Sequence, residues 1–417
     1  MPKRRLAPSA RIGALAERDF RLVFSSTTIS AVGDGVAYIA LVFAILHLAH
    51  NSPTAVGIVL ACRQAAAAIV TLAAGVIADR LPRHLVLVVV ACVQAAVQGV
   101  VGLLIVGGHA TVAVLAVLAA VYGLADGFVI PAQNGLIPAV VSTVRLQQAN
   151  ALLGLSRSIL GFGAPALGGI LVSLGSPGSA ILVDAASFAV AAVLLARVHL
   201  EPREDVVEPE PFLRELREGW SEFRRQRWIF NTIIFFGIGN FAGQAWGVLA
   251  PLVVKEHYGG ATQFGLVGSA FGIGLVIGGL ITLRWHPHRP LLVSCLCAAP
   301  FGLGTWMLAF LVPFPVLLAA QVVAGTGLAI HLALWFTVFQ QQVPAEARSR
   351  VSSYDALGSF ILIPLGTAVV GPLAGQFGVR MTLIVAGAVV GVMNLLVLAQ
   401  REVWAITSEP RTAPAPA

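Results

Sequence analysis

Charged residues are scarce in this chain of 417 residues. Asp, Glu, Lys and Arg make up 11% of it, whereas hydrophobic residues make up 58% and the mean hydropathy is +0.88. Soluble globular domains carry roughly 25% charged residues, so a chain of this composition cannot present an ordinary water-facing surface. The scarcity excludes a typical soluble protein and indicates a membrane protein.

Several chemical motifs are missing as well. The only four cysteines fall within apolar runs and lack the spacing of a metal site, so we interpret them as packing residues: Cys62, Cys92, Cys295 and Cys297. No phosphate-binding loop with its lysine is present, so ATP is not the expected energy source. No nucleophile–histidine arrangement emerges. We expect no enzyme activity, no metal and no bound cofactor, and an ion gradient, namely protons, as the source of energy.

What the sequence has in abundance is long apolar runs. A helix needs about 20 mostly apolar residues to cross a bilayer, and twelve stretches qualify: 22–47, 53–78, 84–107, 110–137, 147–173, 178–198, 228–254, 260–283, 290–311, 314–342, 350–376 and 379–400. Alternating strand patterns are absent. The sequence therefore predicts an all-α, multi-pass membrane protein with twelve transmembrane helices.

The basic residues predict its orientation. All but four of the 26 Lys and Arg residues lie in the two termini or in every second loop; the exceptions are Lys255, Arg380, Arg63 and Arg157. Basic residues concentrate in cytoplasmic loops, so both termini are expected in the cytoplasm. The net charge of +7 expresses this bias, and no nucleic-acid partner is expected.

One long polar stretch divides the chain. Residues 199–227 begin with prolines and acids and continue with apolar residues at helical spacing, which predicts an amphipathic helix on a cytoplasmic central loop. The predicted organisation is an N-terminal segment 1–21, a six-helix bundle 22–198, the loop 199–227, a second six-helix bundle 228–400 and a tail 401–417.

The two halves also resemble each other. An offset of 204 residues superposes "GVIADR" (75–80) on "GLITLR" (279–284), and "APALGG" (164–169) matches "GPLAGQ" (371–376). Each match is weak by itself, but the matches recur in order at corresponding helices. Duplicated six-helix halves are typical of transporters that bind their substrate between the halves.

The loop after the second predicted helix, "GVIADRLPRHLV" (75–86), carries a motif. It resembles the G-x-x-x-D-R-x-G-R-[RK] motif of the major facilitator superfamily, with these matching positions: Gly75, Asp79, Arg80, Arg83 and His84. Pro82 stands where the family has glycine. The resemblance implies a cytoplasmic gate that latches the two halves. A glycine permits close helix contact and an aspartate suits a helix N-terminus, but a loop whose charges only set topology is the alternative.

A narrower resemblance concerns the fifth predicted helix. The segments "RDFRLVFSSTTISAVGDGV", "ADGFVIPAQNGLIP" and "QQANALLGLSRSILGFGAPALGG" resemble the exporter branch with macrolide-efflux and enterobactin-exporter proteins. The antiporter motif G-x-x-x-G-P-x-x-G-G is approximated by Gly161, Pro165, Gly168 and Gly169, and Ala164 replaces one glycine. The resemblance implies export, although a merely structural proline bend would look the same.

Ionisable residues inside the apolar runs are functional candidates because their burial in a bilayer is costly. They are Asp34, Arg63, Asp126, Arg157, Asp184 and Asp355. Matching depths along the helices make two pairs possible, Asp34 with Arg63 and Asp126 with Arg157. Asp355 lies near a helix start, where capping is the default explanation.

We expect one aspartate to carry the proton. Burial favours the neutral form of a carboxyl group and a neighbouring arginine favours the ionised form, so separating such a pair would bind or release a proton. Asp34 is the first choice, because the flanking glycines of "GDG" would open space around its side chain; Asp126 is second and Asp184 third. The alternative is that the pairs only fix helix packing.

Four further side chains are candidates for lining a substrate cavity: Tyr38, Trp246, His331 and Trp335. Lipid contact explains an aromatic residue in a membrane helix equally well, and a lone histidine on an apolar helix is more often packed.

Together these features favour a proton-coupled exporter of amphipathic small molecules, such as antibiotics or a siderophore, that works by alternating access as a monomer in a bacterial cytoplasmic membrane. The alternatives are an importer, a facilitator or a lipid flippase of the same fold, or a membrane sensor or scaffold without transport activity.

Overall fold

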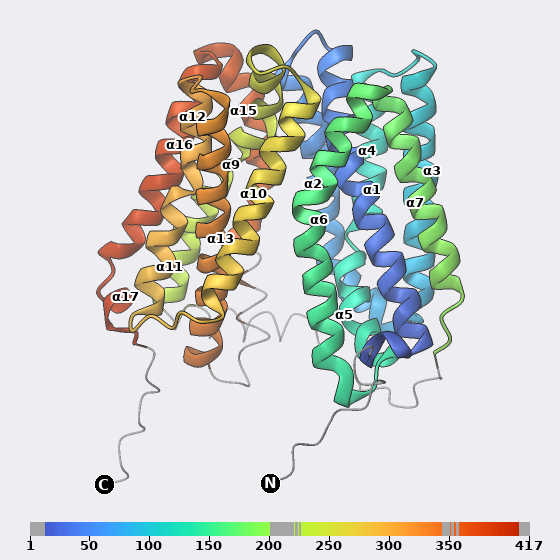
Figure 1. The fold of residues 1–417 in the computed structure, drawn as a ribbon, viewed down its shortest axis with the longest axis horizontal. Coiled ribbons are helices and arrows are strands. Elements are labelled where there is room, and N and C mark those ends of the chain that lie inside the picture. Colours follow the sequence, from blue (N-terminus) through green and yellow to red (C-terminus); the bar gives the residue numbers. More distant parts are fainter. Residues whose placement is uncertain are drawn as a thin grey trace. The chain divides into compact units, whose positions relative to one another are not determined.

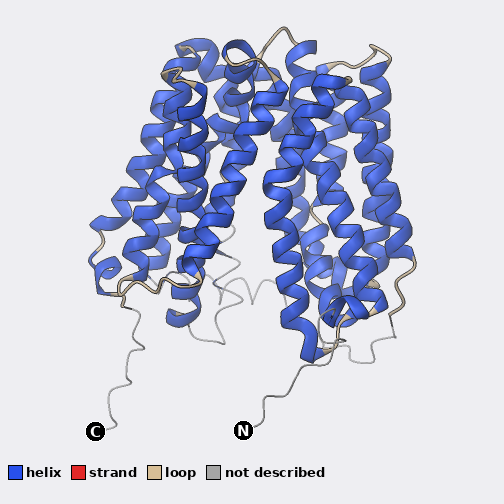
Figure 2. Ribbon diagram, viewed as in Figure 1, coloured by secondary structure: helices blue, strands red, loops and turns tan. Residues whose placement is uncertain are grey.

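The computed structural model describes residues 13–200, 221, 224, 227–343, 351, 354–355 and 358–407, except for the side chains of residues 72–80, 143, 158, 162 and 227. Within these residues the chain is helical and contains no strand (Figures 1 and 2). It divides into two compact units, Met1–Glu204 and Asp205–Ala417. The predicted amphipathic helix within 199–227 lies almost entirely outside the described residues.

Unit 1 is a bundle of long helices. They are α1 (Arg18–Leu48), α2 (Pro53–Arg80), α3 (Arg83–Val106), α4 (Val112–Asp126), α5 (Val129–Val140), α6 (Leu146–Leu174) and α7 (Pro177–Ala196), with short 3₁₀ turns at Gly13–Ala16 and Thr143–Arg145.

Unit 2 is a second bundle. Its helices are α9 (Arg227–His257), α10 (Ala261–Thr282), α11 (Pro290–Ala298), α12 (Leu303–Ala309), α13 (Phe314–Gln342), α15 (Ile363–Phe377), α16 (Val379–Leu396) and α17 (Arg401–Ala405), with 3₁₀ turns at Ala299–Gly302 and Val397–Ala399.

The described residues contain twelve helical segments long and apolar enough to cross a membrane, which confirms the predicted number. Three predicted helices are interrupted in the structure. The span Gly358–Phe377 has a turn at residues 361–362, before α15 begins. The span Val112–Val140 is broken between α4 and α5, and the span Pro290–Ala309 is interrupted by the 3₁₀ turn that contains Pro300. Proline cannot donate a helical hydrogen bond, which accounts for the interruption at Pro300.

Local sequence fixes where several helices begin. The Ser52 hydroxyl accepts a hydrogen bond from the Ala55 amide at 3.3 Å, and Pro53 follows as the first residue of α2. At the start of α7, Ser176 and Ser179 form a reciprocal capping box around Pro177. Such caps satisfy amides that have no partner within the helix.

The same helix pairs pack in both units. In unit 1, α1 packs on α6 and α7, α2 on α4, and α3 on α7. In unit 2, α9 packs on α15 and α16, α10 on α13, and the α11–α12 span on α16. These are the same pairs when each unit's six spans are counted in order, so the weak sequence repeat corresponds to a repeated packing scheme.

Glycines set the tightest helix contacts. In unit 1, a Cβ atom on Gly123 of α4 would collide with the backbone carbonyl of Arg63 on α2. In unit 2, Gly325 of α13 is equally close to the carbonyl of Phe271 on α10. Lipid tails are as apolar as the side chains, so helices in a bilayer associate through such close approach rather than through hydrophobic burial.

The beginning of α1 is tied to the turn between α5 and α6. The half-buried Glu17 carboxylate accepts hydrogen bonds from the Ser142 amide at 2.9 Å and the Ser142 hydroxyl at 2.8 Å, and it pairs with Arg145 at 3.3 Å. The Ala14 amide donates to Gln148 of α6 at 2.9 Å. These bonds hold that end of the bundle closed over an apolar cluster that includes Phe20.

The Gly123 contact predicts a measurable loss of stability. Replacing Gly123 by Ala should lower the free energy of unfolding by about 1–3 kcal/mol, because the backbone of α2 must move away. The matched control is Gly99→Ala on α3, where no described atom lies within 4 Å of the added Cβ. The control should leave stability unchanged or raised by up to about 1 kcal/mol, because alanine favours helix. Thermal unfolding of the purified protein in detergent distinguishes the two; equal effects would contradict the prediction.

The tie at Glu17 predicts a pH-dependent contribution to stability. Hydrogen bonds from Ser142 hold the pKa of the Glu17 carboxyl below its ordinary value. The contribution is therefore present above the ordinary glutamate pKa and is lost as the pH falls through the lowered one. Glu17→Gln should melt a few degrees below the parent protein at pH 7, and the difference should shrink as the melting curves are repeated toward pH 4. A difference independent of pH would show that the carboxylate charge is not involved.

Candidate functional site

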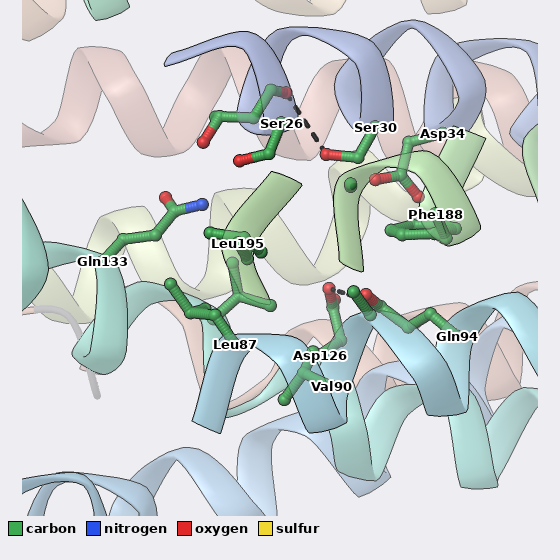
Figure 3. A pocket seen from close by; sticks show the side chains of 14 residues that line it. Ser26, Ser30, Asp34, Leu87, Val90, Gln94, Asp126, Gln133, Phe188 and Leu195 are labelled. Atoms are coloured by element: carbon green, nitrogen blue, oxygen red, sulfur yellow. Dashed lines mark hydrogen bonds between the residues drawn. The ribbon is translucent and has the colours of Figure 1, made fainter. Parts of the chain in front are cut away.

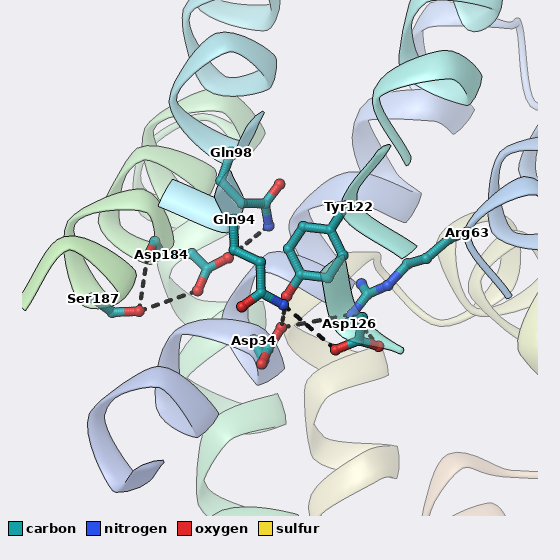
Figure 4. Close-up of polar contacts among 8 residues, drawn as sticks. All are labelled: Asp34, Arg63, Gln94, Gln98, Tyr122, Asp126, Asp184 and Ser187. Carbon is teal, nitrogen blue, oxygen red and sulfur yellow. Dashed lines mark hydrogen bonds and ion pairs between the residues drawn. The ribbon is translucent and has the colours of Figure 1, made fainter. Parts of the chain in front are cut away.

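A cluster of charged and polar side chains lies inside unit 1 (Figure 4). Asp34 comes from α1, Arg63 from α2, Asp126 from the last residue of α4, and Asp184 from α7. These four residues come from four different helices. Two glutamines of α3 and a tyrosine of α4 form hydrogen bonds with their carboxylates.

Arg63 lies between two carboxylates. Its Nη2 atom is 3.7 Å from Oδ1 of Asp34 and 4.0 Å from Oδ2 of Asp126. The close packing of α2 on α4 brings Arg63 to Asp126, because Gly123 is less than one turn before Asp126 and touches the Arg63 backbone. The predicted pair of Asp34 with Arg63 is thus present, and a single arginine nitrogen serves both carboxylates.

Tyr122 connects this ion pair to the rest of the bundle. Its hydroxyl donates to Oδ1 of Asp34 at 2.5 Å, the same oxygen that faces Arg63. The Arg63 guanidinium lies 4.1 Å from the centre of the tyrosine ring, and Phe188 packs edge-on against that ring at 6.0 Å. A cation over a ring face is favourable, more so away from water, so Tyr122 positions both members of the pair.

Two glutamines one turn apart on α3 hold the other two carboxylates. The Nε2 atom of Gln94 is 3.4 Å from Asp126 Oδ1, and that of Gln98 donates to Asp184 Oδ2 at 2.6 Å. Both glutamines are buried. Neutral amides can donate to a carboxyl group in either protonation state without adding charge, so α3 fixes the positions of these acids and contributes no counter-charge.

Asp184 differs from the other acids in its exposure. It is 0% exposed, whereas the side chains of Asp34 and Asp126 are 38% and 39% exposed. Ser187 donates to its Oδ1 atom at 3.2 Å. Asp184 and Ser187 fill the space beside Gly33 of α1.

The glycines around Asp34 therefore do something other than we expected. A Cβ atom on Gly33 would collide with Asp184 and Ser187, and one on Gly35 would collide with Ala164 of α6. The expectation that "GDG" opens space around Asp34 was wrong. Its physical reason is helix packing: the glycines allow α7 and α6 to approach α1 on either side of Asp34.

A pocket inside unit 1 reaches two of the acids (Figure 3). It lies among α1, α3, α4, α5 and α7, and its lining residues are Ser26, Thr27, Ser30, Asp34, Leu87, Val90, Ala91, Gln94, Asp126, Val129, Gln133, Phe188, Ala191 and Leu195. Asp34 and Asp126 both face it, which accounts for their partial exposure. Asp184 does not line it.

Asp126 is not paired with Arg157. Its ion pair is with Arg63, and the Arg157 side chain is exposed. The two residues are at similar depth, but α6 packs on α1 and not closely on α4. Depth along a helix follows from the sequence, whereas the identity of the neighbouring helix does not, and this is why the predicted pairing was wrong.

The gate motif is described only in part. Gly75, Asp79 and Arg80 are in α2, but the structure describes only the backbone there, and the side chains of Asp79 and Arg80 lie outside the described part. The Arg83 guanidinium lies over Gly135 of α5. His84 is half-buried in the first turn of α3, and its Nδ1 atom is buried without a hydrogen bond from any described group.

The motif of the fifth span lies within α6. Pro165 is inside a helix that runs without interruption from Leu146 to Leu174. Gly168 touches the backbone of Val36 on α1, and Gly169 is also buried. At Gly161, no described atom would lie within 4 Å of an added Cβ atom. Close packing on α1 is thus shown for Gly168.

In unit 2 the predicted cavity residues are mostly packed. Trp335 is 3% exposed and lies edge-on to Trp228 and Phe236, with ring centres 5.8 and 5.3 Å away. His331 is 7% exposed, stacks edge-on against Phe236 and is 2.9 Å from the Ser294 hydroxyl. Both belong to the interior of unit 2, where aromatic packing is more favourable than exposure.

The remaining candidates are half-buried. Tyr38 lies on α1 one turn beyond Asp34, and Trp246 lies on α9 beside Gly304 of α12. Asp355 accepts a hydrogen bond from the Trp335 indole at 3.4 Å. The helix start predicted beside it lies outside the described residues.

Sequence reasoning missed Tyr122, Gln94 and Gln98. The sequence does mark each of them, because a polar side chain within an apolar helix needs a hydrogen-bond partner. The two glutamines are four residues apart and therefore share one face of α3. Searching for polar as well as charged residues on common helix faces would have found them.

Comparisons with known proteins agree on one family. The model of the Major Facilitator Superfamily matches residues 23–367. Macrolide efflux protein A of Streptococcus pyogenes is 22% identical over 327 residues, which are 76% of this chain and 80% of that protein. The enterobactin exporter EntS of Shigella dysenteriae is 26% identical over 403 residues, 91% of this chain and 92% of that protein.

Solved structures show the same fold. The nucleoside transporter NupG has a TM-score of 0.71 at 14% identity and covers 91% of this chain and 98% of its own. A bacterial homologue of the iron transporter ferroportin, in an inward-facing state, has a TM-score of 0.71 at 19% identity and covers 92% and 98%. At such identities the likeness shows the fold alone.

The shared arginine predicts a coupled effect on stability. Arg63→Gln leaves the two carboxylates without their cation and should lower the free energy of unfolding by roughly 1–3 kcal/mol. Adding Asp34→Asn to that variant should restore part of the loss, because one uncompensated charge is removed. Melting temperatures of the two single variants and the double variant measure the coupling. Strictly additive losses would show that the two side chains do not interact.

Proposed function

Because the chain belongs to the major facilitator superfamily, we propose that it is a proton-coupled secondary exporter of amphipathic small molecules. It works as a monomer in a bacterial cytoplasmic membrane, with both termini in the cytoplasm. The proposal rests above all on one observation: two carboxylates share a single arginine inside unit 1, and a third lies behind them.

The charge balance of the cluster favours proton binding. Asp34, Asp126 and Asp184 carry three negative charges when ionised, and Arg63 is the one cation that the described ion pairs bring to them. Uncompensated charge within a membrane costs several kcal/mol, and a carboxyl group relieves that cost by taking up a proton. The proposal therefore places proton uptake at this cluster.

Arg63 gives the cluster two arrangements. When Asp34 is ionised, Arg63 and the Tyr122 hydroxyl both stabilise its Oδ1 atom. When Asp34 takes up a proton, the attraction to Arg63 is lost and the guanidinium moves toward Asp126, only 4.0 Å away. A proton thereby breaks the ionic contact between α1 and α2 and leaves the one between α2 and α4. Such a change in helix contacts is what links protonation to an alternation of the two units.

Two observations support outward transport. The relatives with efflux or export in their names are a macrolide efflux protein and an enterobactin exporter. The α6 sequence approximates the antiporter motif, and Gly168 makes the close contact with α1 that this motif implies. Inward proton flow through the cluster would then drive outward movement of the substrate.

Transport by cells tests the proposal directly. We expect efflux-deficient bacteria that produce this protein to export at least one of ethidium, Hoechst 33342 and erythromycin, and to lose that export when a protonophore is added. Asp34→Asn should abolish proton-driven export at unchanged protein levels, because it removes the acid that Arg63 and Tyr122 hold. The matched control is Asp355→Asn, a partly buried aspartate in unit 2 that should leave export intact.

Each other result has a defined meaning. Export that ignores the protonophore indicates a facilitator and overturns proton coupling. Proton-driven export that survives Asp34→Asn moves the carrier to Asp126 or Asp184. Correct membrane insertion without export of any probe, in combination with probe binding, indicates a sensor that does not transport.

A further inference from the structure

The pocket of unit 1 extends well beyond the two acids that face it. It runs from Asp34 and Asp126 toward the end of the bundle where α1 and α3 begin and α7 ends. Leu87 in the second turn of α3 and Leu195 in the last turn of α7 mark that end. By the distribution of basic residues this is the expected cytoplasmic end.

One wall of the pocket is a polar stripe on α1. Ser26, Ser30 and Asp34 are four residues apart and so lie on one face of the helix, over a rise of about 12 Å (Figure 3). The two serine hydroxyls donate to carbonyls of their own helix, Val23 at 2.8 Å and Thr27 at 3.2 Å. Their oxygens remain able to accept hydrogen bonds from the pocket.

The opposite wall is polar as well. Gln94 on α3 and Gln133 on α5 line the pocket across from the stripe. At its inner end, the hydrogen bond and ion pair described for Asp34 both go to Oδ1. Its Oδ2 atom is the carboxylate oxygen that remains for a pocket ligand.

These features favour water over an amphipathic substrate as the occupant of the pocket. A pocket holds water when it is roomy enough and offers each molecule two to four polar partners, and here polar atoms occur at every level from Ser26 to Asp34. The described residues that line the pocket all belong to unit 1, whereas large substrates of transporters with duplicated halves bind at the interface of the halves.

We infer that this pocket is a water-filled proton path within unit 1, which extends from Asp34 and Asp126 toward the end of the bundle where α1 begins, as far as Ser26 and Leu195. A hydronium ion in the pocket gives its proton to Oδ2 of Asp34; an O–H bond forms on the carboxylate, one breaks on the hydronium ion, and water remains. The proton thus reaches the cluster by a route that the substrate does not use. The inference rests on the proposed proton coupling.

Other titratable groups lie near the cluster. They are Arg63 on α2, Tyr122 on α4, Asp184 on α7 and Tyr38 on α1. Asp184 lies behind Gly33 and outside the pocket. A proton on the path therefore meets Asp34 and Asp126 before Asp184.

The first half of the test asks whether the pocket holds water, and needs no substrate. In a full-length variant without the four native cysteines, Ser30→Cys and Ala91→Cys are each treated with the small thiol reagent MTSEA in membranes. Both residues line the pocket, so both thiols should react, because thiolates form and react only where water reaches them. The control Ala40→Cys, on α1 at 0% exposure and outside the pocket, should stay unmodified. Absence of labelling at both pocket positions overturns the inference.

The second half asks whether the pocket carries protons. In proteoliposomes, proton uptake and ethidium transport are followed before and after MTSEA modifies Ser30→Cys. Blocking the path should slow proton uptake several-fold. The ethidium concentration that gives half the maximal rate of ethidium transport should stay unchanged. Unaltered proton uptake, or a raised ethidium concentration at half-maximal rate, overturns the path; the latter makes the pocket a substrate site. If the unmodified protein moves ethidium without protons, the proposed function itself has failed, and the labelling result still stands for the pocket.

Discussion

Helices in a bilayer gain little from hydrophobic contact with one another, and this constraint shapes the whole chain. The apolar composition places each helix in lipid, but lipid tails would solvate an isolated helix equally well. What brings the helices of each unit together is backbone contact at glycines and a small number of polar bonds. Gly123 against Arg63 and Gly325 against Phe271 are the contacts of the first kind.

In unit 1 the close contact and the polar cluster depend on each other. The glycine on α4 lets α2 approach until Arg63 is beside Asp126, and the glycine on α1 lets α7 approach until Asp184 is beside Asp34. Small residues thus determine which charges meet. The charges in turn make the approach specific, because a displaced helix would leave a carboxylate without its partner.

The sequence predicted the class of fold and the existence of the cluster far better than the pairing within it. Twelve apolar runs, a duplicated half and the charged positions within helices follow from one-dimensional patterns, and Asp34 with Arg63 was found by depth alone. The partner of Asp126 was not, because depth does not tell which helices are lateral neighbours. The same limitation misassigned Trp335, whose burial depends on its position against Trp228 in the folded unit. The glycines beside Asp34 were interpreted as open space, whereas side chains from other helices fill it.

The repeated packing scheme has an electrical consequence. The helix of unit 2 that packs as α1 does in unit 1 is α9, and at its polar positions it carries the neutral side chains Asn240 and Gln244, which bond to Ser359 and Thr367. Moving one elementary charge across 100 mV changes the free energy by about 2.3 kcal/mol. A membrane voltage therefore acts on the buried charges of unit 1 and finds little to act on along the matching face of α9. Within the duplicated scaffold, α1 therefore carries a charge on which voltage acts, and the matching face of α9 is neutral.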